Sequence, residues 1–175
     1  MALIPSALAQ KLLQATNNAK SAEIGLSNMG KAISEYLVQN AEIIFSWNGA
    51  KSTSSPPVPD PLTIGNGKII SMPPITIIPS MATNKNTSNS NLGIQIALGI
   101  SLGIYNLNPS WVTSPGMIGN MPPIKINLSG NNREKAMLQL ATQIIDAIKK
   151  YKPVMPCVGS RGSFIGGIGK VIQIK

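Results

Sequence analysis

GKIISMPPITIIPS, at residues 67–80, recurs 49 residues later as GMIGNMPPIKINLS, at residues 116–129. The two stretches are identical at eight of fourteen positions, and both contain the kernel Met-Pro-Pro-Ile-x-Ile. Because adjacent prolines remove two backbone N–H donors, neither stretch can be a continuous central strand. The isoleucines that alternate after the prolines predict a short extended segment with one apolar face. We interpret the repeat as an internal duplication that supplies two extended, edge-like arms.

The sequence around each copy favours duplication over chance similarity in a chain rich in proline and isoleucine. Each copy is followed by a polar loop and then by an apolar segment ending in tyrosine, at 92–105 and 133–151. Segment 133–151 has helical spacing, with Asn131 or Asn132 as its cap and lysines near its end. Segment 92–105 alternates like a strand, but its small residues recur every four positions. We expect a helix there, buried by protein or by lipid.

The N-terminal region carries a heptad-like pattern, with apolar residues at alternating steps of four and three between Leu8 and Trp47. This spacing predicts a long helix that starts with Ser6 as its cap and stops at Trp47. Asn17-Asn18 and Gly25 are the places where it could break into two helices. Its alanine-rich seam either faces the core of its own domain or also bundles with copies of itself.

Three other segments predict irregular structure. Residues 48–66 are rich in proline and predict an extended linker, and residues 81–91 and 106–120 predict polar loops. Near the C-terminus, five glycines between 159 and 169 precede the alternating sequence KVIQIK at 170–175. We expect this last segment to be an edge strand, either of its own sheet or added to the sheet of a neighbour.

These elements predict an α+β fold. We expect a long N-terminal heptad helix, a buried apolar segment and a C-terminal helix, joined by proline-rich extended arms and short edge strands. The expected organisation is an N-terminal helical region at 1–48 and a duplicated region at 49–175, integrated into one domain.

The composition excludes several kinds of chemistry. The 175 residues contain no histidine and a single cysteine, so Ser-His-Asp triads, histidine metal sites and disulfide frameworks are excluded. The six acidic residues are scattered, and neither the phosphate-loop pattern nor G-x-G-x-x-G is present. We therefore expect no catalytic residues, no metal, no cofactor and no small-molecule substrate.

The surface is expected to be weakly charged, because only 12% of the residues are charged, while the net charge is +9. Such a surface is typical of a subunit that covers much of its exterior with neighbours, although a small neutral-surfaced monomer is the alternative. The positive charge leaves open non-specific contact with nucleic acid or with a membrane. The first residues lack a basic start before an apolar core, so no signal peptide is expected.

The alanine-rich heptad helix, Asn/Ser loops, proline-rich arms, duplicated kernel and glycine-hinged terminal strand together resemble virion structural proteins of tailed bacteriophages, of the neck, tail or baseplate type. This resemblance implies a non-enzymatic subunit of a virion, assembled in the host cytoplasm and bound to copies of itself and to other structural proteins. The alternatives are a small basic membrane-associated protein that inserts residues 92–105, or a non-specific nucleic-acid packaging protein. The expected contact residues lie in the seam, the two kernels and the terminal strand: Leu12, Ala15, Ala19, Ala22, Leu26, Met72, Pro73, Pro74, Ile75, Met121, Pro122, Pro123, Ile124, Val171, Ile172 and Ile174.

Overall fold

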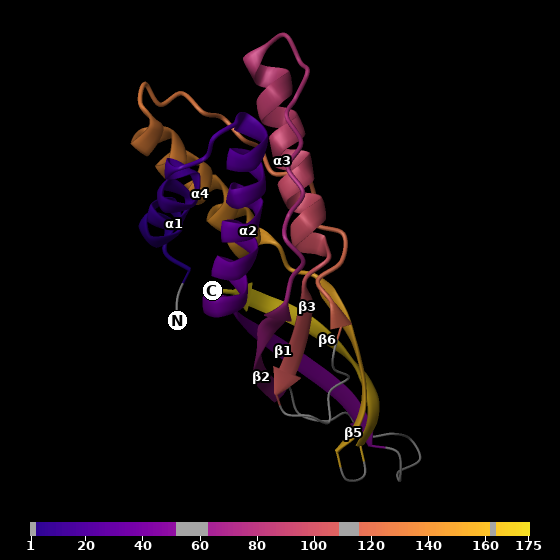
Figure 1. Cartoon of the computed structure of the whole chain (residues 1–175). Coiled ribbons are helices and arrows are strands. Elements are labelled where there is room, and N and C mark those ends of the chain that lie inside the picture. The colour runs from indigo at the N-terminus through magenta and orange to yellow at the C-terminus, as the bar shows by residue number, and fades with distance from the viewer. Residues whose placement is uncertain (1–2, 52–62, 109–115, 162–163) are drawn as a thin grey trace.

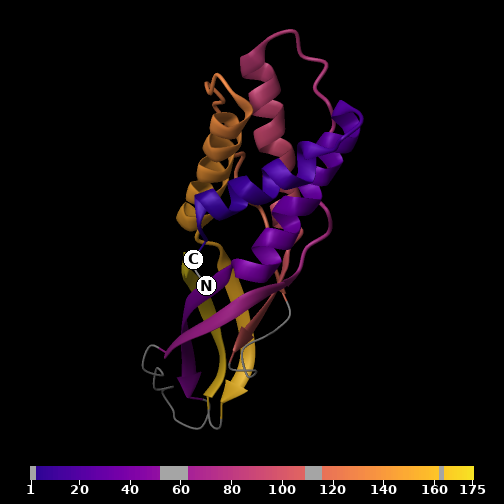
Figure 2. The same cartoon turned by 60° about the vertical axis from the view of Figure 1, so that its left-hand side comes forward.

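Helices gather at one end of the molecule and a curled antiparallel sheet forms the other (Figures 1 and 2). The computed structural model describes residues 3–51, 63–108, 116–161 and 164–175. Its helices are α1 (Pro5–Asn17), α2 (Ala22–Asn40), α3 (Lys85–Ser101) and α4 (Arg133–Lys150). Its strands are β1 (Glu42–Lys51), β2 (Thr63–Ser71), β3 (Ile104–Asn108), β4 (Gly116–Met117), β5 (Val154–Arg161) and β6 (Phe164–Ile174). The chain therefore combines helices with an antiparallel sheet, as the α+β prediction requires.

The strand order is β4-β3-β2-β1-β6-β5, and every neighbouring pair is antiparallel. The C-terminal segment at 170–175 lies in β6, which pairs with β1 on one side and with β5 on the other. β6 is an inner strand of the sheet, so predicting an edge strand was wrong for it, although the pairing with β5 reaches only Lys170 of the segment 170–175. Val171 and Ile174 are consequently buried in the chain's own core.

The N-terminal heptad pattern is divided between two helices and a strand. α1 ends at Asn17, and Ser21 starts α2 by accepting a hydrogen bond from the Ile24 N–H at 3.2 Å. The break thus follows Asn17-Asn18, one of the two expected places. Ser6 does not cap α1, whose cap is Ile4 with proline at the first helical position. Trp47, expected as the end of the helix, belongs to β1.

Helix α3 covers most of the ambiguous apolar segment and also residues 85–91, which were expected to form a loop. Asn84 starts the helix by accepting a hydrogen bond from the Thr87 N–H at 2.8 Å. The loop prediction was wrong because polar residues can form solvated first turns once a cap is in place. The helix ends at Ser101, so the last residues of the segment at 92–105 belong to β3.

The proline-rich linker is shorter than expected, since β1 continues to Lys51 and β2 begins at Thr63. The proline cluster at 56–61 lies outside the described residues. The expected loop at 106–120 likewise contains the end of β3 and all of β4, while its residues 109–115 lie outside the described part.

The two Met-Pro-Pro-Ile-x-Ile kernels are extended but belong to no strand. We call residues 72–78 arm 1 and residues 121–127 arm 2. The kernels have the expected alternation, with Met72, Ile75 and Ile77 buried in arm 1 and Met121, Ile124 and Ile126 buried in arm 2. These side chains join those of all four helices and of the sheet in one hydrophobic core. The arms therefore stabilise the packing of helices rather than extending the sheet.

Candidate interaction site

After α1, the described residues form three similar units, each a helix followed by two antiparallel strands: α2 with β1 and β2, α3 with β3 and β4, and α4 with β5 and β6. Each helix starts in the same way. Ser21, Asn84 and Asn132 accept hydrogen bonds from the backbone N–H groups three residues later. The duplicated kernel is therefore part of a larger repeat, in which an arm follows the first and the second unit.

Counted from these caps, the same helical positions are buried in all three units. The matching sets are Gly30, Ile33, Ser34 and Leu37 in α2, Gly93, Ile96, Ala97 and Ile100 in α3, and Ala141, Ile144, Ile145 and Ile148 in α4. A sequence signal for this match exists in the tetrapeptides Ser-Asn-Met-Gly at 27–30 and Ser-Asn-Leu-Gly at 90–93. It was missed because the third unit lacks it.

Each arm crosses the preceding helix at a glycine. The carbonyl oxygen of Ile75 lies against Gly30, and that of Ile124 lies against Gly93, where a Cβ atom would overlap it. Only glycine lets a backbone approach a helix this closely. The two arms therefore dock on α2 and α3 in the same manner.

Each arm is also held by a glutamine of the following helix. The Ile78 N–H donates to Gln95 Oε1 at 2.9 Å, and Gln95 Nε2 donates to the Ile78 carbonyl at 3.4 Å. In the next unit, the Asn127 N–H donates to Gln143 Oε1 at 2.7 Å, and Gln143 Nε2 donates to the Asn127 carbonyl at 2.9 Å. The arms thus join consecutive helices, whereas α1 packs against both α2 and α4.

Many of the contact residues expected from the sequence are buried in the chain's own core. Leu12, Met72, Ile75, Met121, Ile124, Val171 and Ile174 are all buried, so their apolar surface is already covered within the chain. Ala15, Ala19 and Leu26 are half-buried, and the exposed members are Ala22, Pro73, Pro74, Pro122, Pro123 and Ile172. For the buried residues the proposal of contact with a partner is corrected, because folding of the single chain already places them in its interior.

The outward face of α3 differs from those of its sister helices. Three exposed positions spaced four residues apart, in the second half of α3 and at its C-cap, carry Ile94, Leu98 and Leu102, which are 39%, 62% and 51% exposed. The equivalent positions carry Lys31, Glu35 and Gln39 on α2, and Thr142, Asp146 and Lys150 on α4. We call Ile94, Leu98 and Leu102 the α3 stripe. Exposed Ile78 of arm 1 lies beside it, because its backbone is bonded to Gln95.

The sequence did not reveal the α3 stripe, since large residues surround the whole helix and predicted burial on every side. Lys85, in the first turn, is the only charged residue of α3. The three units show that only one face of each helix is needed for packing. The apolar character of the stripe is therefore not explained by the fold.

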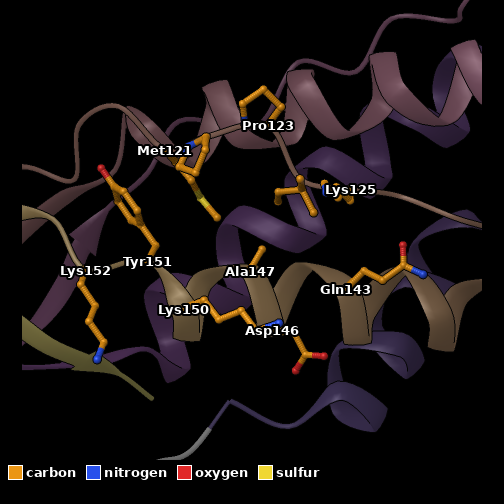
Figure 3. Close-up of a pocket in the computed structure, with 11 residues that line it drawn as sticks. Met121, Pro123, Lys125, Gln143, Asp146, Ala147, Lys150, Tyr151 and Lys152 are labelled. Carbon is orange, nitrogen blue, oxygen red and sulfur yellow. The ribbon is translucent and has the colours of Figure 1, made fainter.

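A second feature is a cavity of about 420 Å³ between arm 2 and α4. Met121, Pro123, Ala147 and Tyr151 contribute apolar surface, as Figure 3 shows. Lys125, Lys150, Lys152 and Asp146 also line it. We call this cavity the arm 2 pocket.

The phenol of Tyr151 closes one end of the arm 2 pocket. Its hydroxyl donates a hydrogen bond to the Ile118 carbonyl at 3.4 Å. Partial burial raises the pKa of the Tyr151 hydroxyl above its ordinary value of 10.0, because desolvation disfavours the phenolate. The group therefore remains a neutral hydrogen-bond donor at neutral pH.

The pocket opens where the third unit departs from the second. Ala147 and Tyr151 occupy the positions that Gly99 and Gly103 hold in α3. A methyl group at Gly99 would lie 2.6 Å from the Ile75 side chain, and one at Gly103 would lie 2.8 Å from Met72. The glycines thus let arm 1 pack closely on α3, whereas the larger residues of α4 leave space beside arm 2.

The acidic side chains take part in a few surface ion pairs. Glu35 pairs with Lys11 and Lys31, and Glu42 pairs with Lys175. Within the described ranges, no three His, Cys, Asp or Glu side chains lie close enough together to hold a metal ion. Of the helices described, none has the length and apolar character that a bilayer span requires.

Comparisons with known proteins returned no match to a family model, to a curated protein or to a solved structure.

Proposed function

We propose that this chain is a non-enzymatic structural subunit of a larger assembly, joined to its neighbours through the α3 stripe. The observation that carries the proposal is the contrast among sister helices. At the three positions of the stripe, α2 and α4 carry polar residues, whereas α3 carries exposed apolar ones. Elsewhere α2 and α4 each expose a single large apolar residue, Ile24 and Leu138. Apolar patches that the fold does not require are typical of interaction sites.

A second copy of the chain is the partner that this surface fits best. Two chains that each carry +9 repel one another wherever their lysines face. The α3 stripe is free of charge, so it can face its own copy across a twofold contact without placing like charges together. Ile78, whose backbone is bonded to Gln95, is a further exposed apolar residue next to α3.

Within this class we place the protein in the virion of a tailed bacteriophage, as a neck, tail or baseplate component assembled in the host cytoplasm. This narrower assignment is supported by the resemblance of the sequence to virion structural proteins and by its low content of charged residues. The expected partners are copies of itself and other structural proteins of the particle. Immunogold labelling of purified particles tests the placing, and labelling confined to the host lysate would overturn it.

The chain offers a matched test of the α3 stripe. The triple variant Ile94→Lys, Leu98→Glu and Leu102→Gln gives α3 the residues that α2 carries at these positions. The control variant Gln10→Lys, Gln14→Glu and Asn18→Gln places the same triplet at exposed positions of α1 and its C-cap, none of which lines the arm 2 pocket, and neither variant changes the net charge. We expect light scattering to show a mass above 18.4 kDa for the wild type and the control, but a monomer for the stripe variant.

Three results would overturn the proposal. A wild-type chain that stays monomeric at every concentration would contradict self-association. Flotation with liposomes that survives high salt would favour the membrane-associated alternative, in which the stripe contacts lipid. Binding to DNA or RNA that weakens steeply as salt rises would favour nucleic-acid packaging instead.

A further inference from the structure

The arm 2 pocket carries basic side chains from two elements. Lys125 comes from arm 2, Lys150 is the last residue of α4, and Lys152 lies two residues after the end of that helix. Among the described residues these three lysines form no ion pair. Asp146 is the acidic residue of the lining, so the charged side chains of the pocket sum to +2.

The second unit shows that this charge is specific to the pocket. The residues equivalent to Lys125, Lys150 and Lys152 are Thr76, Leu102 and Ile104, none of which is charged. On the side that faces the following helix, arm 1 and arm 2 thus differ both in packing and in charge. A cavity of about 290 Å³ also lies beside arm 1, toward α2, but there Lys31 is accompanied by Glu35.

We propose that the arm 2 pocket binds an acidic peptide segment of a neighbouring subunit, with a large apolar side chain inserted between arm 2 and α4. This inference rests on the proposed function, since it supplies the assembly with a second contact. The volume falls within the range of ligand pockets, roughly 300–1,000 Å³. Met121, Ala147 and Tyr151 receive the apolar side chain (Figure 3), and the lysines of the lining attract the carboxylates of the peptide.

The shape of the site favours a peptide over a small molecule. The pocket lies along the exposed, extended backbone of arm 2 rather than inside the core. An extended segment can lie parallel to arm 2, where alternate side chains point toward the cavity and toward solvent. Charge complementarity with the rim then selects acidic residues in that segment.

The test uses fluorescein-labelled peptides and the full-length chain, with binding measured by fluorescence anisotropy. The probe is the peptide DDLFDD, and its controls are KKLFKK, with the charge reversed, and DDSSDD, without the apolar residues. We expect DDLFDD to bind tightest and to weaken as salt rises, because the rim charges are exposed. Equal binding of all three peptides, or no binding of DDLFDD, would overturn the proposal.

Two variants locate the binding site. Lys150→Glu with Lys152→Glu reverses the rim and should weaken DDLFDD about tenfold, the combined effect of a few exposed charge pairs. Lys20→Glu with Lys85→Glu makes the same change in net charge at exposed lysines elsewhere and should leave affinity within about twofold of wild type. Equal weakening by both pairs would show attraction by the whole chain rather than by this pocket.

Ala147→Phe fills the pocket from α4 and should abolish binding of DDLFDD while the thermal unfolding midpoint stays near that of wild type. Dodecanoate serves as a lipid-like probe, and binding of dodecanoate without DDLFDD would assign the pocket to an apolar carboxylate instead. DDLFDD should still bind the monomeric stripe variant. If the wild-type chain self-associates but does not bind DDLFDD, the pocket proposal alone is overturned. If it binds DDLFDD but stays monomeric, the α3 contact alone is overturned.

Discussion

Helices α3 and α4 bury the same positions in the core, but the surfaces that they present to solvent differ in chemical character. Both bury the residues 9, 12, 13 and 16 places after an asparagine cap. Outward, α3 carries isoleucine and leucine where α4 carries threonine, aspartate and lysine. The repeat therefore determines which helical positions pack into the core, whereas the solvent-facing residues differ from one unit to the next.

The two helices also differ in what lies against them. Arm 2 crosses α3 at Gly93, while the equivalent residue of α4 is Ala141, which is fully buried in a helix that packs against α1. The third unit is thus followed by no arm, and α4 packs against α1. Three predictions test this difference between the units.

The largest effect is expected from Gly93→Ala, although α4 has alanine at the equivalent position. The new methyl group would overlap the carbonyl of Ile124, so arm 2 must move away from α3. We expect a loss of about 3 kcal/mol in the free energy of unfolding, measured by urea denaturation. Gly25→Ala is the control. Its methyl group meets only Ala19 at 3.5 Å, so it should stabilise the protein by about 0.5–1 kcal/mol. A mild effect at Gly93 would show that the arm is not closely docked.

Ser34→Ala sharpens the comparison between α2 and α3, which has Ala97 at the equivalent position. The Ser34 hydroxyl donates to the Pro73 carbonyl at 2.8 Å and accepts from the Ile75 N–H at 3.1 Å. The substitution leaves that buried N–H without its acceptor, which should cost about 2 kcal/mol in unfolding free energy. Ser27→Ala, on the exposed side of α2, should change stability by less than about 0.5 kcal/mol. Similar values for the two serines would contradict a role in holding arm 1.

The smallest effect is expected at the glutamines that hold the arms. Gln143→Ala removes both hydrogen bonds to Asn127 and should cost about 1 kcal/mol in thermal or urea unfolding. Gln95→Ala should cost less, because its bond to the Ile78 carbonyl is longer, at 3.4 Å. Gln143→Glu keeps the acceptor and loses only the donor, so it should recover part of the stability. An equal loss for the alanine and glutamate variants would mean that the amide acts through packing.

Some features of the candidate site were within reach of the sequence. The repeated kernel predicted two extended arms with alternating burial, and the structure has both. A cap at Asn131 or Asn132 and the helix that follows were also predicted, and Asn132 is the cap. The third unit was not predicted. Its helix buries the same positions as the other two helices, but its residues are almost all different from theirs. The α3 stripe was missed because a helix with apolar residues all round does not indicate which side faces solvent.

By itself, the sequence determined the local structure of this protein. Adjacent prolines remove backbone donors and keep the arms out of the sheet, and asparagine or serine caps start three of the helices. Only the tertiary structure decided that the C-terminal strand lies inside the sheet, that α1 packs beside α4, and that one face of α3 stays uncovered. The reason is that each of these outcomes depends on contacts between residues far apart in the chain, which hydrophobic periodicity does not encode.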